Sequence, residues 1–184
     1  YLHERFAGGE FYRGIKTVMT IHNLKFQGKW SIKEVQSITG LPDYYFAPDK
    51  LEAYKDGNFL KGGIVFADAV TTVSNTYAGE IQTEEYGEGL EEHLRYHHNK
   101  LVGIVNGIDT DIWNPATDKL LAAPYDSQNV IENKKANKKA LQESLGLQVD
   151  DHKIVIGLIS RLTNQKGLDL VNSVITHTMD EHTQ

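Results

Sequence analysis

The chain has 184 residues, of which 40% are hydrophobic and 24% charged, a composition typical of a folded globular protein rather than a disordered or fibrous one. Its 19 basic and 25 acidic residues give a formal net charge of −6, which argues against nucleic-acid binding through a broad basic surface. The apolar runs are far shorter than the roughly 18 residues of a membrane span, and the lack of cysteine excludes disulfides, thiolate nucleophiles and cysteine-based metal sites.

Three runs rich in β-branched residues predict strands in the first part of the chain, at Thr17–Ile21, Ala69–Val73 and Leu101–Val105. None of them alternates apolar and polar residues, which is typical of strands buried on both faces of a parallel sheet. Helical patterns lie between them at Asn58–Phe66 and Ser74–Thr83, and the second pattern opens with a serine that can act as an N-cap. This order predicts an α/β fold with right-handed crossovers.

Turn residues and polar chain follow the third strand and predict a linker over residues 109–128. A helix rich in lysine and asparagine is predicted from about Asn129 to Leu145, with a glycine at its C-terminal end. Lys153–Ile159 is predicted to be a fourth buried strand, and another helix is predicted from about Leu168. The chain on either side of the linker is therefore expected to form two separate α/β units.

Polar side chains follow the predicted strands, at the positions where ligands bind in α/β sheets. His22 and Asn23 follow the first strand, and Asn106 follows the third. Arg161 and Lys166 frame the loop between the fourth strand and the next helix. An arginine and a lysine near a helix N-terminus can hold an anion, because the free N–H groups and the helix dipole add to the two charges. Diphosphate is the candidate ligand.

Each of these residues also has a structural interpretation. His22 can bridge backbone groups at the end of a strand. Asn106 can belong to a turn formed with Gly107, and Arg161 and Lys166 can be solvated loop residues. The residue pattern alone leaves both interpretations open.

Three further motifs are given structural interpretations. Lys61–Gly63 lacks the spacing of a phosphate-binding P-loop. Asp109–Asp111 offers two carboxylates but no complete coordination sphere, and His93 and His97 have no third ligand nearby in the sequence. No metal site is therefore predicted.

Four blocks of the sequence resemble the bacterial glycogen synthase and plant starch synthase family, in the family's order and spacing and over nearly all 184 residues. The blocks are Thr20–Leu24 with Phe26–Gly28, Ala67–Ser74, Val105–Asp109 with Trp113–Pro115, and Ser160–Gly167. The family implies a GT-B type glycosyltransferase with two Rossmann-like domains and parallel sheets. Such an enzyme adds glucose from ADP-glucose, with retention, to the non-reducing end of an α-1,4-glucan such as glycogen.

The resemblance also implies roles for individual residues. In this family the histidine matching His22 lies beside the transferred glucose, with the residue matching Asn23 next to it. The residue matching Asn106 lines the glucose pocket, and those matching Arg161 and Lys166 hold the diphosphate. His22, Arg161 and Lys166 are thus implied as catalytic and Asn23 and Asn106 as substrate-binding, with neither a metal nor a cofactor.

The family further implies a domain arrangement. Residues 1–108 correspond to the C-terminal part of the N-terminal domain, 109–128 to the interdomain linker and 129–184 to the beginning of the C-terminal domain. The family's Lys-x-Gly-Gly-Leu loop and the Glu-x-x-Gly motif of its C-terminal half have no counterpart here. We therefore expect a fragment truncated at both ends, inactive alone, with an exposed apolar edge that favours self-association. The expected location is the cytoplasm of a bacterium, or the plastid if the source is a plant.

Two alternatives stay open. One is another GT-B glycosyltransferase, acting on sucrose or on a cell-surface acceptor, because a histidine after a strand and an arginine–lysine pair are shared widely in that superfamily. The other is a non-catalytic glucan-binding module, for which the aromatic cluster of Trp30 and Tyr44–Phe46 is the candidate platform. Core packing explains that cluster equally well.

Overall fold

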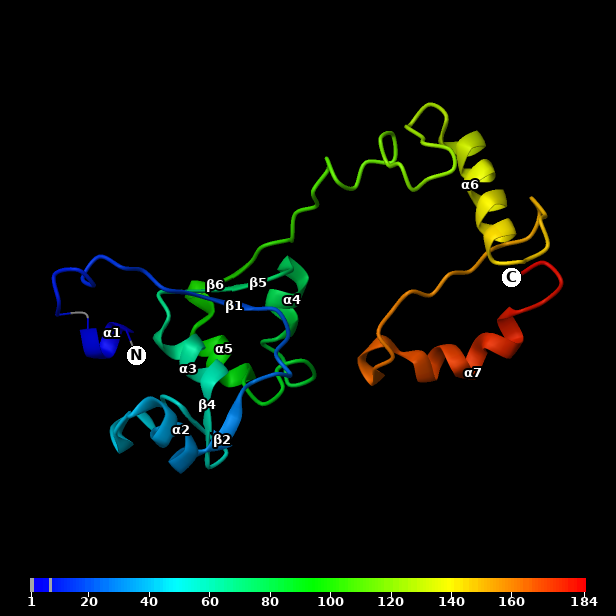
Figure 1. Ribbon diagram of the computed structural model, residues 1–184. Coiled ribbons are helices and arrows are strands. Elements are labelled where there is room, and N and C mark those ends of the chain that lie inside the picture. The colour runs from blue at the N-terminus through cyan, green and yellow to red at the C-terminus, as the bar shows by residue number, and fades with distance from the viewer. Residues whose placement is uncertain (1, 7) are drawn as a thin grey trace. The chain divides into compact units, whose positions relative to one another are not determined.

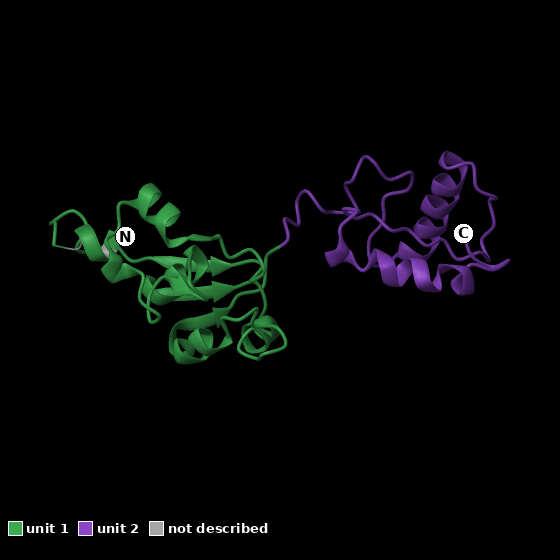
Figure 2. Ribbon diagram, turned by 90° about the horizontal axis from the view of Figure 1, so that it is seen from below, with its two compact units in different colours: residues 1–107 green, residues 108–184 purple. Residues whose placement is uncertain are grey.

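The structure is a computed structural model that describes residues 2–6 and 8–184 (Figure 1). The chain divides into two compact units, residues 1–107 and residues 108–184 (Figure 2). The helices and strands of unit 1 are α1 (Leu2–Phe6), β1 (Val18–Ile21), β2 (Lys29–Ser31), α2 (Ile32–Thr39), the 3-10 helix η1 (Asp43–Tyr45), β3 (Glu52–Ala53), β4 (Asp56–Asn58), α3 (Phe59–Phe66), β5 (Ala69–Thr72), α4 (Asn75–Glu80), α5 (Glu91–Tyr96), the 3-10 helix η2 (His98–Lys100) and β6 (Leu101–Gly103). Those of unit 2 are α6 (Val130–Ser144), the 3-10 helix η3 (Asn164–Lys166) and α7 (Leu168–Thr178).

Unit 1 contains a parallel sheet in which β5 lies between β1 and β6. Each of these strands lies within the run that the sequence predicts for it, and helices connect them, so the predicted α/β fold class is confirmed. The register pairs Ile21 with Thr72 and Thr72 with Gly103. The three strands therefore end side by side, and the segments that follow them leave the sheet at one edge.

One face of this sheet is covered and the other is open. Ile21 and Val70 pack against the helices α3 and α5 in a buried cluster completed by Leu24, Leu60, Ile64, Ile81, Leu90 and Leu94. On the opposite face Val18 is 62% exposed and Val102 is 54% exposed. The prediction of strands buried on both faces is thus wrong for the described residues. Helices α3 and α5 supply apolar side chains to one face only. The strand register places Val18 and Val102 on the other face, where they stay exposed.

Side-chain caps start α3 and α4, and the cap at Ser74 is the predicted one. The side chain of Asn58 accepts a hydrogen bond from the N–H of Lys61 at the start of α3, and Ser74 accepts one from the N–H of Tyr77 at the start of α4. Both satisfy backbone donors that the first helical turn leaves unpaired. The long helix α6 is followed by Gly146, whose backbone is in the left-handed region at φ 66°. This is the conformation expected of the glycine predicted at the end of this helix.

A second, antiparallel sheet of order β2-β4-β3 is not predicted from the sequence. It packs with α2, which opens with a capping box formed by Ser31 and Glu34. A Cβ atom on Gly57 of β4 would lie 2.7 Å from the Cγ2 atom of Val35, so the absence of a side chain allows this close packing. Val35 belongs to a second buried cluster that contains Tyr45 and Phe46.

Unit 2 does not form the predicted fourth strand. Within Lys153–Ile159, Ile154 forms an isolated β-bridge with Thr183. Leu158 is 58% exposed and Ile159 is fully exposed. A buried parallel strand requires neighbouring strands for its backbone hydrogen bonds and helices for its faces. The described residues of unit 2 contain no named strand beside this run, so the apolar run stays extended and open.

The later part of the segment predicted as a linker, 109–128, is hydrogen-bonded to α6. The N–H of Tyr125 donates to the carbonyl of Pro115 (2.9 Å), and Asn137 of α6 exchanges two hydrogen bonds with Ala123. The division between units falls between Gly107 and Ile108. Among the described residues, no helix is both long enough and apolar enough to cross a membrane.

Candidate functional site

The carboxyl edge of the β1-β5-β6 sheet carries the predicted residues of unit 1. Pairing continues one residue beyond β6, because the N–H of Ile104 donates to the carbonyl of Thr72 (2.7 Å). The chain that follows β1 begins with His22 and Asn23, and the chain that follows β6 reaches Asn106. These segments start from neighbouring strand ends and lie at the ligand-binding edge of a parallel sheet.

His22 and Asn23 are exposed, whereas the residues on either side of them are buried. Ile21 is 1% exposed and Leu24 is completely buried. The Asn23 side chain accepts a hydrogen bond from the N–H of Lys25 (3.0 Å), which stabilises the turn. The His22 ring makes no hydrogen bond with any described residue, so the interpretation of His22 as a bridge between backbone groups has no support in the structure.

Asn106 is exposed and lies in irregular chain. Residues 104–109 form neither a turn nor a strand, and Gly107 does not have a positive φ. The interpretation of Asn106 and Gly107 as a turn is therefore wrong. The pattern Asn-Gly often marks a turn, but here Ile104 prolongs the pairing of β6 with β5 and the chain continues without a turn as far as Asp109.

Arg161 and Lys166 lie on one short exposed loop of unit 2. The N–H of Thr163 donates to the carbonyl of Arg161 (2.9 Å), and the N–H of Lys166 donates to the carbonyl of Thr163 (3.0 Å). Gly167 follows in the left-handed region at φ 65°, and α7 starts at the next residue. Neither cationic side chain forms an ion pair with the described residues. Two unpaired cations beside a helix N-terminus suit an anionic ligand.

The structure thus brings the predicted residues together in two groups. His22, Asn23 and Asn106 belong to one sheet edge in unit 1, and Arg161 and Lys166 belong to one loop in unit 2. Each group is polar and exposed, so a substrate can reach it, and each belongs to a single unit.

Lys61 is a structural residue, as predicted. It lies within α3, is 1% exposed, and its ammonium group donates to the backbone carbonyls of Pro48 and Glu52. Burial lowers the pKa of Lys61, while the nearby charges of Glu52 and Asp49 raise it. The two carbonyls replace the water that the charged group loses on burial.

Other discounted groups are also explained by local structure. The Asp109 carboxylate accepts hydrogen bonds from the N–H groups of Asp111 and Ile112, both at 3.0 Å, which is a local turn motif. His93 lies on α5, and burial together with the charge of Lys61 lowers its pKa. Among residues 2–6 and 8–184, no group of three or more metal-binding side chains is found.

The aromatic residues considered as a glucan platform divide into two kinds. Tyr45 and Phe46 are buried in the second core cluster, which is the core-packing interpretation. Trp30 is 54% exposed and Tyr44 is 66% exposed, and the ammonium of Lys50 lies 2.9 Å from the centre of the Tyr44 ring. Core packing therefore explains two of the four residues.

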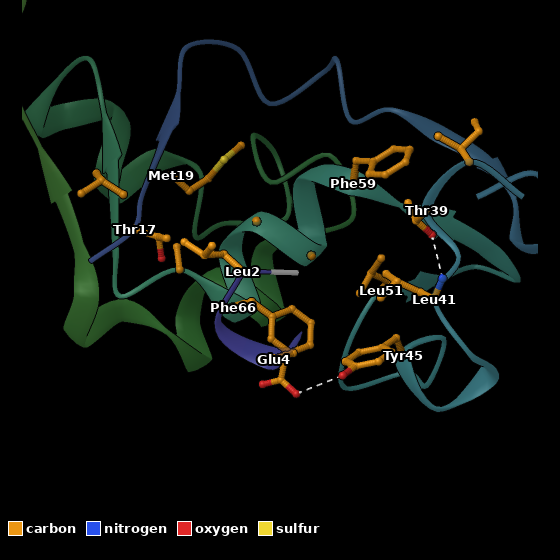
Figure 3. A pocket seen from close by; sticks show the side chains of 15 residues that line it. Leu2, Glu4, Thr17, Met19, Thr39, Leu41, Tyr45, Leu51, Phe59 and Phe66 are labelled. Atoms are coloured by element: carbon orange, nitrogen blue, oxygen red, sulfur yellow. Dashed lines mark hydrogen bonds between the residues drawn. The ribbon is translucent and has the colours of Figure 1, made fainter. Parts of the chain in front are cut away.

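Unit 1 contains a cavity of about 620 Å³, and its lining includes Tyr45 but not His22, Asn23 or Asn106 (Figure 3). Its wall includes Met19 of β1 and Thr17, which precedes that strand, together with Phe59 and Phe66 from the two ends of α3. A carboxylate oxygen of Glu4 is 3.5 Å from the hydroxyl of Tyr45 at its rim. The cavity is mainly apolar and contains none of the predicted site residues, so it is not the candidate site.

Sequence reasoning did not identify the side chains that hold the turn after β1. Thr72 donates to the carbonyl of Ile21, the N–H of Leu24 donates to the hydroxyl of Tyr77, and the amide of Gln27 is paired with that of Asn58. These partners are separated by 31 to 53 positions in the chain. No spacing within a single element could have indicated them.

The chain is 59% identical to the glycogen synthase of Lachnospira eligens and 54% identical to that of Lachnoclostridium phytofermentans, in each case over all 184 residues. It spans 38% of the length of both relatives. It also matches the solved catalytic domain of starch synthase IV from Arabidopsis thaliana bound to ADP and acarbose, with 37% identity and a TM-score of 0.88, covering all of this chain and 38% of that one.

The chain matches one protein family. The parallel sheet with its helices agrees with this match, as do the relatives and the polar residues that follow the strands. The family is described as the starch synthase catalytic domain, and the match covers residues 1–96, just over half of the 184 residues. The chain therefore belongs to the starch synthase catalytic domain family.

Proposed function

We propose that this chain is part of an ADP-glucose-dependent glycogen synthase, a retaining glycosyltransferase that adds glucose to the non-reducing end of an α-1,4-glucan. The observation that carries the proposal is the pair of exposed, unpaired cations, Arg161 and Lys166, on the loop directly before α7. Family membership and the glycogen synthases among the relatives support the reaction class. The ADP-bound starch synthase structure supports an adenine nucleotide as the donor carrier.

In the proposed reaction the bond between the anomeric carbon of glucose and the phosphate oxygen of ADP-glucose breaks, and a bond forms between that carbon and a hydroxyl oxygen of the glucan. Arg161 and Lys166 stabilise the negative charge that develops on ADP, which is worth several kcal/mol of barrier when the charges are positioned in advance. The departing phosphate accepts the proton of the attacking hydroxyl. This assignment requires no metal and no other cofactor.

The other predicted residues contact the sugar. His22 lies beside the transferred glucose, next to Asn23, and Asn106 lines the same pocket. Residues 1–108 belong to the later part of one Rossmann-like domain, residues 109–128 connect the domains, and residues 129–184 begin the second domain. The enzyme acts in the bacterial cytoplasm, where the cysteine-free sequence is compatible with a reducing environment.

The test is a chimeric enzyme in which this chain replaces the matching 184 residues of the Lachnospira eligens glycogen synthase. We expect the chimera to incorporate labelled glucose from ADP-glucose into glycogen, and to prefer ADP-glucose to UDP-glucose. A folded chimera that transfers no glucose would contradict the proposal. Transfer from another donor or to another acceptor would favour a different GT-B glycosyltransferase.

The chain alone is expected to be inactive, because it lacks the family's Lys-x-Gly-Gly-Leu loop and Glu-x-x-Gly motif and spans 38% of the length of the glycogen synthases it matches. Its exposed apolar residues, such as Ile156 and Leu158, favour self-association of the isolated chain. Light scattering on the 184-residue chain tests this, and a strictly monomeric sample would contradict it. Glucan binding by the chain without donor would instead favour the non-catalytic binding module.

A further inference from the structure

The turn between β1 and β2 contains His22 and Asn23, and side chains from three other parts of unit 1 hold it. The first is Thr72, at the end of β5. Its hydroxyl donates to the carbonyl of Ile21 (2.8 Å), and Thr72 is 1% exposed. This hydrogen bond fixes the peptide group that joins Ile21 to His22, in addition to the pairing of the two strands.

The second side chain is Tyr77 of α4. Its hydroxyl accepts a hydrogen bond from the N–H of Leu24 (3.2 Å). Leu24 is completely buried, so its N–H has no access to water as an alternative partner. The Tyr77 ring packs against the first core cluster, and its own N–H donates to Ser74 at the start of α4. The hydroxyl is therefore held in place by both the core and the helix cap.

The third group is a pair of buried amides. The side-chain oxygen of Gln27 accepts from the amide nitrogen of Asn58 (2.7 Å), and the Gln27 nitrogen donates to the carbonyl of Glu88 (2.9 Å). Gln27 is 5% exposed and Asn58 is completely buried. Asn58 is itself fixed as the N-cap of α3. The far end of the turn is thus tied to β4, α3 and the segment before α5.

These contacts leave the two exposed residues between fixed points. Ile21 and Leu24 are held on either side of His22 and Asn23, and Gln27 is held three residues further on. Few backbone conformations can satisfy all three anchors at once. A site whose groups are held before the substrate binds loses less conformational entropy on binding and keeps its reacting geometry.

We propose that Thr72, Tyr77 and Gln27 are positioning residues that set the backbone of His22 and Asn23 for glucose transfer. The inference rests on the proposed function, which places His22 beside the transferred glucose. None of the three needs to touch substrate. They act through the peptide groups of the turn.

The primary test is Tyr77→Phe in the Lachnospira chimera. This change removes one hydroxyl and keeps the ring that packs on the core. We expect kcat to fall about tenfold, since displacing a reacting group by a fraction of an ångström has effects of this order. KM for ADP-glucose should change less than twofold, and the melting temperature should fall by only a few degrees. Thr72→Val, which also removes one hydroxyl at nearly constant shape, should act in the same direction.

The matched control is Tyr45→Phe. The Tyr45 ring is buried in the second core cluster, and its hydroxyl bonds to Glu4 rather than to the turn. We expect its kcat to stay within twofold of the parent. In the isolated 184-residue chain, amide hydrogen exchange of Leu24 should accelerate in Tyr77→Phe and remain unchanged in Tyr45→Phe.

The outcomes separate this inference from the proposed function. If His22→Ala strongly lowers kcat while Tyr77→Phe and Thr72→Val stay within twofold of the parent, the positioning role is wrong and the proposed function stands. If the loss in Tyr77→Phe disappears on cooling in parallel with recovery of folded protein, the hydroxyl has a structural role and the inference is also overturned. If His22→Ala leaves turnover unchanged, the role of His22 beside the transferred glucose is wrong and the inference fails with it, while glucose transfer by the parent chimera still supports the proposed function. A folded parent chimera that transfers no glucose would overturn the proposed function itself.

Discussion

His22 and Asn23 in unit 1 lie between the buried residues Ile21 and Leu24, whereas Arg161 in unit 2 is followed by Leu162, which is 89% exposed. The turn of His22 is bonded to side chains of β5 and α4, while the Arg161 loop is held by backbone hydrogen bonds between residues two or three positions apart. Both regions carry residues proposed to act on the same donor. The comparison indicates that unit 1 fixes its site residues through tertiary contacts, and that unit 2 fixes its own through local chain geometry.

Removing core atoms should show the largest difference between the units. Ile64 is completely buried in unit 1, whereas Ile156 of unit 2 is 51% exposed. Ile64→Ala should lower the free energy of unfolding of unit 1 by about 2–5 kcal/mol, and Ile156→Ala should change that of unit 2 by about 0.5 kcal/mol or less. Amide hydrogen exchange reports each unit separately. Equal losses in both units would contradict the comparison.

The two cations of unit 2 should matter for catalysis despite their exposure. In the chimera, Arg161→Ala and Lys166→Ala should each cost about 3 kcal/mol in kcat/KM for ADP-glucose, roughly a hundredfold or more. The double variant should lose less than the sum, because the pair shares one charged ligand. Glucan affinity should not change. Wild-type kcat/KM in both single variants would return Arg161 and Lys166 to the solvated-loop interpretation.

The contact between β6 and α4 offers a sharper test of packing in unit 1. A Cβ atom on Gly103 would lie 2.5 Å from the carbonyl oxygen of Ser74, which is backbone and cannot rotate away. Gly103→Ala should therefore destabilise unit 1 by about 1–3 kcal/mol in urea unfolding. Gly79→Ala on α4 is the matched control, since nothing lies within 4 Å of its Cβ position. It should be neutral or stabilising by about 0.5–1 kcal/mol, and a Gly103→Ala variant as stable as this control would show that the close approach is unimportant.

A smaller, pH-dependent effect is expected at the start of the sheet. The Asp68 carboxylate accepts hydrogen bonds from the ammonium of Lys16 (2.9 Å) and the N–H of Thr17 (2.8 Å), which hold the pKa of Asp68 well below its usual range. Because the folded-state pKa is the lower one, this stabilisation is fully present above the unfolded-state pKa of about 4 and is lost as the pH falls through the folded-state value. Asp68→Asn should thus lose less stability than the parent between pH 7 and pH 3. Parallel losses in urea midpoints would contradict this.

The sequence predicts the parallel strands of unit 1 and the helices α3, α4 and α6 because their signals are local. Runs of β-branched residues and cap residues such as Asn58 and Ser74 act within a few positions. The strands β2, β3 and β4 have two or three residues each, too few for a periodic pattern, although the capping box of Ser31 and Glu34 marks the start of α2.

The failed prediction at Lys153–Ile159 has the opposite cause. An apolar run indicates that a segment can be buried, but a strand also needs partners that the run itself does not contain. The candidate site shows the same division. His22 and Arg161 are found from their positions after predicted strands and from family resemblance, whereas Tyr77 and Gln27 act through partners more than 30 residues away.

His22→Ala in the chimera tests the central claim most directly, which is that the fixed turn at the carboxyl edge of the unit 1 sheet presents a residue to the transferred glucose. The parent chimera and the variant are compared for kcat with ADP-glucose and for melting temperature. We predict that kcat falls about a hundredfold or more, the scale of losing one positioned transition-state contact, while the melting temperature changes little because His22 is exposed. Near-normal turnover combined with a large loss of thermal stability would contradict the account and make His22 a structural histidine.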